Sequence, residues 1–176
     1  MRHLSRPLLR ALARTVLPVG ALLTLAPSAL AVTTTTTFQV TATVLKACLM
    51  TTPGTLAFGS YDPSAASLNG TTSLIVTCTF GTPYSIGLNP GVGSGASVSN
   101  RLMTSSSSAA GNNTLGYGLF KDSGHLTNWD NSVAGTGYTG SGLPQTQTIY
   151  GQILTGQYTA APATDYTDTI TVSLTY

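Results

Sequence analysis

The sequence predicts an all-β domain built as an antiparallel β-sandwich. Short stretches alternate between apolar and polar residues with period two, which is the side-chain period of a strand. Gly, Pro and Asn separate these stretches at short intervals, as turns do between antiparallel strands. After residue 31 no helical period of useful length occurs. The chain is poor in charge, yet recurring runs of Val, Ile, Leu and Tyr favour a folded β domain over disorder.

Residues 1–31 have the composition of a secretory signal peptide. Their basic start is made by Arg2, Arg6, Arg10 and Arg14. An apolar segment over residues 16–26 follows, and residues 29–31 supply the small side chains that signal peptidase reads. Pro18 and Gly20 interrupt this short apolar segment, so no stable membrane span is expected, although an uncleaved anchor is the alternative. We predict export and a mature chain that begins at Val32.

Removal of the signal peptide reverses the sign of the net charge. The mature part keeps Lys46, Arg101 and Lys121 against five aspartates, a formal charge of −2. No basic patch remains, so nucleic acid is not an expected partner. A surface with so few charges suits a protein that packs against copies of itself.

Cys48 and Cys78 are the only cysteines of the chain. An exported protein meets an oxidising compartment, where such a pair forms a bridge. A catalytic thiol or a metal pair would need further ligands or a partner, and the only mature histidine is His125. We predict a structural disulfide that closes a loop of about 30 residues and adds about 3–4 kcal/mol in the chain-entropy model.

The most regular strand pattern near the mature N-terminus covers residues 33–48. One face of this segment carries Phe38, Val40, Ala42 and Val44, and the opposite face carries Thr and Gln. A strong amphipathic strand at a chain end needs a sheet to join. It therefore pairs within its own domain or reaches into another domain.

Further strands are expected along the rest of the chain. The segments are residues 56–59, 71–80, 84–88, 115–121, 146–154 and 166–176, with a short strand at Arg101–Met103. Asn69-Gly70 is expected to be a turn before the second of these. Trp129 is expected to anchor the loop over residues 128–144. In the last segment Ile170, Val172 and Leu174 share one face, and the chain stops on that strand.

These features together resemble the spore coat protein U family, which includes the pilin subunits of archaic chaperone–usher pili. The resemblance rests on the alternating strand that leads into Cys48, on Leu56-Ala-Phe-Gly59 and on Leu74-Ile-Val-Thr-Cys78. It also rests on Leu115-Gly-Tyr-Gly-Leu-Phe120 and on the closing Tyr166-Thr-Asp-Thr-Ile-Thr-Val. Their order covers nearly all of the mature chain.

The resemblance implies an incomplete immunoglobulin-like sandwich that lacks its last strand and is completed by donor-strand exchange. Residues 32–46 would be the donor extension, with Phe38, Val40, Ala42 and Val44 as its inserting side chains. Residues 47–176 would form the pilin domain, with Ile170, Val172 and Leu174 in the wall of its acceptor groove. Partners would be copies of the chain or related pilins, a periplasmic chaperone and an outer-membrane usher. The protein would pass through the periplasm to the cell surface, in a fibre that serves adhesion or biofilm formation.

The sequence leaves two other functions open as alternatives to a pilus subunit. A carbohydrate-binding tip adhesin could use the aromatic and amide side chains of one loop, namely Asn128, Trp129, Asp130, Asn131 and Tyr138. In a Gly-rich loop such residues more often cap the core, and tip adhesins of such pili generally carry a separate binding domain. A spore-coat-type structural protein is the other alternative, since the family name covers both.

An enzyme is not expected. The mature chain offers one histidine, five scattered aspartates and no glutamate, and His125 follows a turn as a solvated loop residue. Ser105–Ser108 carries no nucleophile motif. Asp165 and Asp168 fall on opposite faces of a strand, so they are not expected to hold a metal together. We predict no catalytic residues, cofactor or metal.

Overall fold

The computed structural model describes residues 30–109 and 111–176. The chain divides into two units, one ending at Thr41 and the other running from Ala42 to Tyr176. The second unit is the folded domain, and its regular structure is entirely β. Within the described ranges, no helix is long and apolar enough to cross a membrane. The predicted signal peptide lies almost wholly outside these ranges, so its cleavage remains a prediction.

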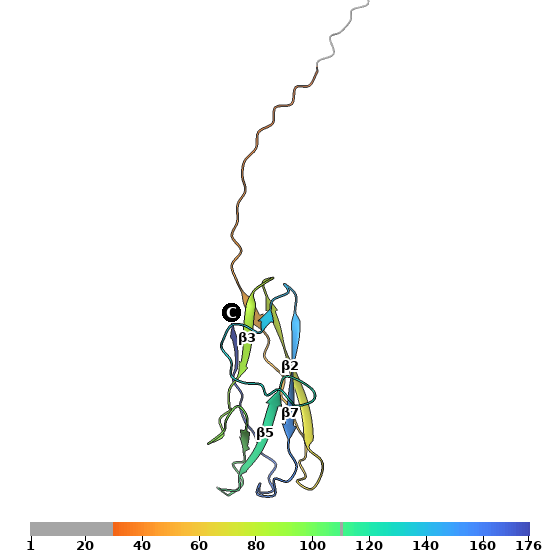
Figure 1. Ribbon diagram of the computed structural model, residues 1–176, viewed down its shortest axis with the longest axis vertical. Coiled ribbons are helices and arrows are strands. Elements are labelled where there is room, and N and C mark those ends of the chain that lie inside the picture. The colour runs from red at the N-terminus through yellow and green to blue at the C-terminus, as the bar shows by residue number, and fades with distance from the viewer. Residues whose placement is uncertain (1–29, 110) are drawn as a thin grey trace, which may run out of the picture. The chain divides into compact units, whose positions relative to one another are not determined.

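Two antiparallel sheets make up the domain (Figure 1). The larger sheet has the strand order β1-β2-β7-β5-β4, and the smaller, open half-sheet has the order β6-β3-β8. The strands are β1 (Cys48–Met50), β2 (Leu68–Cys78), β3 (Pro83–Leu88), β4 (Arg101–Thr104), β5 (Thr114–Phe120), β6 (Tyr138–Thr139), β7 (Gln145–Ile153) and β8 (Val172–Thr175). This arrangement confirms the predicted β-sandwich.

The core lies between the two sheets because each sheet turns its apolar face inward. The buried residues of the larger sheet are Leu74, Val76, Cys78, Leu115, Tyr117, Leu119, Ile149 and Ile153. The half-sheet supplies Tyr84, Ile86 and Leu88, and the loop before β6 supplies Trp129. Their period-two spacing in β2, β3, β5 and β7 is the spacing that predicted these strands.

The half-sheet leaves one edge open beside β8. On its paired side β8 aligns Val172 with Leu88 and Thr175 with Ser85 of β3. Because β3 also pairs with the short strand β6, the order β6-β3-β8 places β8 at the sheet edge. The sandwich is therefore open along one side.

The structure corrects three expected elements. Residues 56–59 belong to no strand, because no neighbouring strand accepts their backbone groups. The last strand is confined to β8, since residues 166–171 bond only at isolated points to loops and to β4. Asn69 and Gly70 are not a turn but pair with Gln152 and Gly151 inside the β2–β7 ladder. The long β7 strand opposite them decides this outcome.

The predicted disulfide is confirmed. Cys48 and Cys78 are bonded and face each other across the β1–β2 ladder. Cys78 is buried in the core, whereas Cys48 is half-buried. The bridge therefore fixes the start of the domain, directly after the N-terminal extension, onto a strand inside the larger sheet.

Candidate functional site

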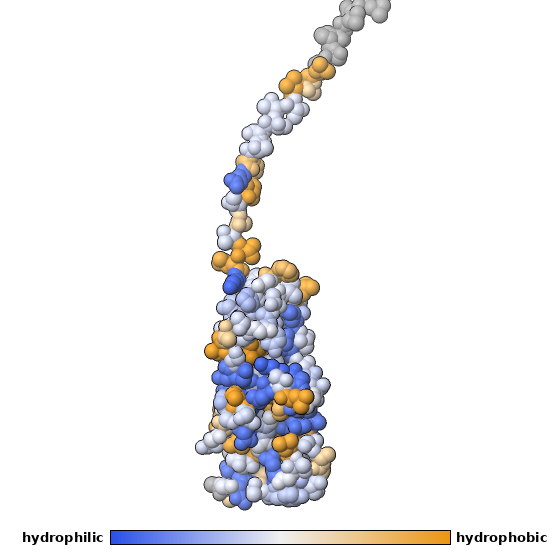
Figure 2. Space-filling model, viewed as in Figure 1, coloured by the Kyte–Doolittle hydropathy of each residue, from blue (hydrophilic) through white to orange (hydrophobic). Residues whose placement is uncertain are grey.

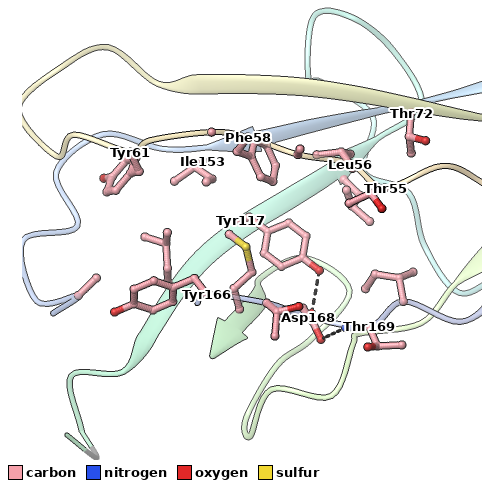
Figure 3. Close-up of a pocket in the computed structure, with 18 of the residues that line it drawn as sticks. Thr55, Leu56, Phe58, Tyr61, Thr72, Tyr117, Ile153, Tyr166, Asp168 and Thr169 are labelled. Atoms are coloured by element: carbon pink, nitrogen blue, oxygen red, sulfur yellow. Dashed lines mark hydrogen bonds between the residues drawn. The ribbon is translucent and has the colours of Figure 1, made fainter. Parts of the chain in front are cut away.

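A long groove follows the open side of the sandwich (Figure 3). Its volume is about 1360 Å³, and its floor is formed by apolar side chains of the core. The floor residues are Leu88, Met103, Leu115, Tyr117, Leu119, Ile149 and Ile153. One wall is the segment 52–61, and the other is the segment 160–172 that leads into β8. The groove thus exposes part of the core between two extended segments.

Both walls carry backbone groups without partners. Among the hydrogen bonds of the described residues, none involves a backbone N–H or C=O of residues 55–60. On the opposite wall Thr167 and Thr171 bond away from the groove, to Thr104 and Asn89. Ile170 lies between them, and none of the bonds of the described chain uses its backbone groups. Two facing edges with free backbone groups can accept one more strand between them.

The first wall is seated on two glycines of the larger sheet. Gly70 and Gly151 face each other in the β2–β7 ladder, and the side chains of Leu56 and Phe58 lie over them. A Cβ on Gly151 would lie 2.8 Å from Phe58 Cζ and 2.9 Å from Leu56 Cδ1. The middle of this wall is held by packing, because the two glycines leave room for its large side chains. Hydrogen bonds from the Thr72 hydroxyl to the Gly54 carbonyl and from the Tyr61 hydroxyl to the Leu154 carbonyl hold its ends.

A polar group interrupts the apolar floor. The Tyr117 hydroxyl donates to Asp168 Oδ2 at 2.7 Å (Figure 3). Asp168 Oδ1 accepts from the backbone N–H of Val92 at 2.8 Å. Burial, with the bond to Asp168 acting in the same direction, raises the pKa of the Tyr117 phenol far above its ordinary value. The phenol is therefore a neutral donor, and it holds the second wall over the floor.

Behind this pair lies a fully buried arginine. The guanidinium of Arg101 donates to the carbonyl oxygens of Leu88, Asn89, Val98 and Trp129 at 2.6–3.0 Å. Burial lowers the pKa of the Arg101 guanidinium, and the nearby Tyr117 and Asp168 oppose that shift. The arginine connects the end of β3 and two loops, the β3–β4 loop and the β5–β6 loop, beneath the groove. The sequence pattern indicated only a short strand here, because a lone arginine carries no signal of burial.

Two of the three residues predicted for the groove wall line the groove. Ile170 and Val172 line the groove. Leu174 is half-buried against the core, where it aligns with Ile86 of β3, and it is not among the residues that line the groove. The sequence did not identify Leu56 and Phe58 as the facing wall. Two glycines opposite each other could have indicated it, but strand register is not visible in a single sequence.

The predicted donor side chains are exposed. The exposed fractions of Phe38, Val40 and Val44 are 88%, 81% and 85%, and Ala42 is also exposed. Figure 2 shows apolar side chains at intervals along this extension. Residues 30–47 belong to no strand. The face of large apolar side chains read from the sequence is therefore accessible to a partner.

The loop considered for sugar binding is largely committed to the core. Trp129 is 1% exposed, and its indole Nε1 donates to the Ile86 carbonyl at 3.0 Å. Tyr138 stacks on buried Tyr84 with ring centroids 5.2 Å apart. Trp129 is therefore not available as a platform for a sugar, and Tyr84 covers one face of Tyr138. Trp129 anchors its loop, as the sequence predicted.

His125 is not a simple solvated loop residue. It is half-buried and packs edge-on against Phe120, with ring centroids 5.2 Å apart. Its Nδ1 lies 3.4 Å from Nε2 of Gln152. A backbone φ of 56° places it in the left-handed region, which a non-glycine residue seldom adopts. These contacts fit a structural role in the turn after β5.

Asp165 and Asp168 bond to different partners, but neither belongs to the strand on which the sequence placed them. The carboxylate of Asp165 accepts from the hydroxyls of Ser105, Ser106 and Ser107 and from two backbone N–H groups. The serine hydroxyl bonds hold the pKa of this carboxyl well below its ordinary range. Within the described ranges, no group of three His, Cys, Asp or Glu side chains could hold a metal ion. The serine run therefore fixes Asp165, and with it the second groove wall, by hydrogen bonds.

Comparison with known proteins agrees with this geometry. The family model described as Spore Coat Protein U domain matches residues 34–173. A curated relative, Protein U of Myxococcus xanthus, is 38% identical over 135 residues, covering 70% of this chain and 72% of the relative.

A solved structure is also similar. It is the complex of CsuC and CsuE, a chaperone–tip adhesion subunit pre-assembly complex from archaic chaperone–usher Csu pili of Acinetobacter baumannii. The similarity has a TM-score of 0.53 and 26% identity, and it covers 76% of this chain but only 40% of the matched chain. The family description names a spore coat protein, and the solved structure contains a pilus subunit, so both are structural types of protein. The chain belongs to the Spore Coat Protein U domain family.

Proposed function

We propose that the chain is a structural subunit of a secreted surface fibre, an archaic chaperone–usher pilus, polymerised by donor-strand complementation. The observation that carries the proposal is the groove with two unpaired walls in a chain that also exposes an amphipathic segment. The extension of one copy would insert between the walls of the next copy. It would pair with both edges and cover the apolar floor.

The dimensions of donor and groove agree. From Phe38 to Val44 an extended strand spans about 20 Å at about 3.3 Å per residue. The unbonded wall over residues 55–60 has a comparable length. Four alternating side chains of the donor would face the floor, and Gln39, Thr41 and Thr43 between them would face solvent. Shape and polarity therefore both favour insertion of this segment.

A chaperone is the natural partner of a subunit whose core is exposed. An open apolar groove on an unassembled chain favours aggregation, so a periplasmic chaperone would cover it until an outer-membrane usher transfers the subunit. The solved structure of a chaperone with a Csu pilus subunit supports this assignment. Residues 1–31 would direct export as a signal peptide and then be removed.

A spore-coat-type assembly is the second candidate. It is favoured by the 38% identity with Protein U of Myxococcus xanthus and by the family description. Donor-strand complementation would serve a coat as well as a pilus, because the groove specifies only how neighbours join. A sugar-binding tip adhesin is less favoured, since Trp129 and Tyr138 are engaged in the core.

The direct test is assembly of the exported chain. The chain is expressed with and without its candidate chaperone and analysed by electrophoresis without boiling. We expect ladders of non-covalent multimers that collapse to monomer on boiling. Deletion of residues 32–46 should abolish the ladders while the domain keeps its fold. A ladder that survives this deletion would contradict the proposal.

A further inference from the structure

The end of the domain where the extension leaves carries exposed apolar surface that is not part of the groove. Leu49 and Phe80 are 76% and 86% exposed, although both are large apolar side chains. With Thr77 and Gly142 they line a shallow hollow of about 420 Å³, and Figure 2 shows apolar surface at this end of the domain. We name these four residues the root patch.

A second exposed apolar pair lies at the opposite end. Leu154 and Tyr158 are 61% and 70% exposed. They follow β7 where Ile153 aligns with Leu68, at the other end of β2 from Cys78 and the root patch. Tyr158 also lines the groove, so this pair lies beside one mouth of the groove. We name Leu154 and Tyr158 the far patch.

The connection between donor segment and domain is short. Ala47 is fixed to its own domain, because its N–H donates to Thr79 Oγ1 and its carbonyl accepts from the Thr79 N–H. Only Leu45 and Lys46 separate it from Val44, the last inserting side chain of the proposed donor. Three Cα steps span at most about 11 Å. If the proposed function is correct, the root patch therefore lies against the groove mouth of the next copy.

The direction of the inserted strand selects which mouth. β8 runs toward the root end, since Thr175 aligns with Ser85 near the start of β3. Every ladder of the domain is antiparallel. The two walls run in opposite directions, because the segment 52–61 leads from β1 away from the root end and β8 runs toward it. β8 is the edge strand of the half-sheet, whereas residues 55–60 belong to no strand, so a donor that extends the half-sheet lies antiparallel to β8. This direction places Phe38 deep in the groove and Val44 at the far end of the acceptor. The far patch is at this mouth.

We infer that the root patch of each subunit packs against the far patch of the next copy of the chain. The charges at the two ends are complementary, because exposed Lys46 lies at the root and exposed Asp62 lies in the turn beside the far patch. The contact joins two different surfaces, so it can repeat from copy to copy along a fibre. It would hold neighbouring domains in a fixed orientation, which donor insertion alone does not require.

Cysteine cross-linking tests the pairing directly. In the full exported chain, Phe80→Cys and Tyr158→Cys are combined, and assembled multimers are oxidised, boiled and separated without reductant. We expect a covalent ladder. The matched control combines Phe80→Cys with Leu126→Cys, because Leu126 is 88% exposed on the side turn after β5. This control should give only monomer after boiling.

The outcomes separate this inference from the proposed function. Non-covalent multimers that yield no covalent ladder would overturn the patch contact and leave donor insertion standing. Dimers formed by Phe80→Cys alone would also overturn it, because they would indicate a root-to-root contact. Absence of any multimer from the unmodified chain would overturn both proposals.

A second pair of variants avoids added cysteines. Phe80→Asp should weaken association between copies by about tenfold, since a mostly exposed phenylalanine loses the partner that would bury it. Leu126→Asp should leave association unchanged. Both side chains are exposed in the single domain, so circular dichroism should report the same fold for the two variants. Equal association of the two variants would overturn the inference.

Discussion

Insertion of the extension into a neighbour can be tested by separating its donor and acceptor roles. Val40 is 81% exposed in the single chain and would be buried between the groove walls after insertion. Burial of a valine side chain contributes about 1.5–3 kcal/mol, which is about 10–150-fold in association. A lysine in its place removes this gain and adds a desolvation cost of several kcal/mol. Val40→Lys should therefore fold and accept a donor strand, but fail to donate.

The complementary variant acts on the groove. Ile170 is half-buried, lines the groove and has no backbone hydrogen bond among the described residues. Ile170→Lys places an ammonium group at the open groove, where water can solvate it until a donor strand arrives. This variant should therefore donate but fail to accept. Each variant alone should remain monomeric, and an equal mixture should form one-to-one dimers that grow no further.

Size-exclusion chromatography with light scattering measures this outcome. Thr41→Lys is the matched control, because Thr41 lies next to Val40 on the opposite face of the extension and should assemble normally. Three results would refute the reasoning. They are multimers of Val40→Lys alone, an unfolded Val40→Lys monomer, and a loss of assembly in Thr41→Lys equal to that in Val40→Lys.

Four variants and one treatment probe the domain itself. Arg101→Ala should lower the free energy of unfolding by about 3–5 kcal/mol in denaturant titration, because it leaves buried carbonyl oxygens without donors; a loss under about 1 kcal/mol would contradict the assigned role. Reduction of the Cys48–Cys78 bridge should raise the intact mass after alkylation and lower stability by about 3–4 kcal/mol. His125→Gly should keep assembly and stability, whereas His125→Val should melt at a lower temperature, because a β-branched residue is strained at φ 56°. The pKa of the Asp165 carboxyl is lowered in the folded state. Its contribution to stability is therefore present above its unfolded pKa of about 3.9 and is lost progressively as the pH falls below that value. Asp165→Asn should reduce the dependence of the melting temperature on pH between pH 5 and 2, by about the slope that one carboxylate contributes.

The alternation of side chains determined most of the fold class from the sequence. Leu115, Tyr117 and Leu119 are spaced by two and are all buried on one face of β5, and the same spacing identified β3 and β7. This works because the direction of a strand side chain depends only on its parity along the chain. The disulfide was likewise predictable, since two cysteines in an exported chain allow one pairing.

The amphipathic extension was also visible in the sequence. Phe38, Val40 and Val44 are exposed despite being apolar, which fits a segment that needs a partner outside its own fold. The sequence pattern could not decide between pairing inside the domain and reaching another chain. Both alternatives require the same alternating face.

The presence of the groove and the identity of its walls followed only from the tertiary structure. The pattern predicted strands over residues 56–59 and 166–171, but a strand exists only where another strand lies beside it, and these two segments face each other across a gap. The position of Phe58 over Gly151 depends on the register between β2 and β7, which joins Gly70 to Gly151, 81 positions further along the chain. The burial of Arg101 depends on carbonyl groups from the end of β3 and from two separate loops that converge on one point. Local periodicity carries no information about such long-range pairing, because it is set by how the whole chain packs.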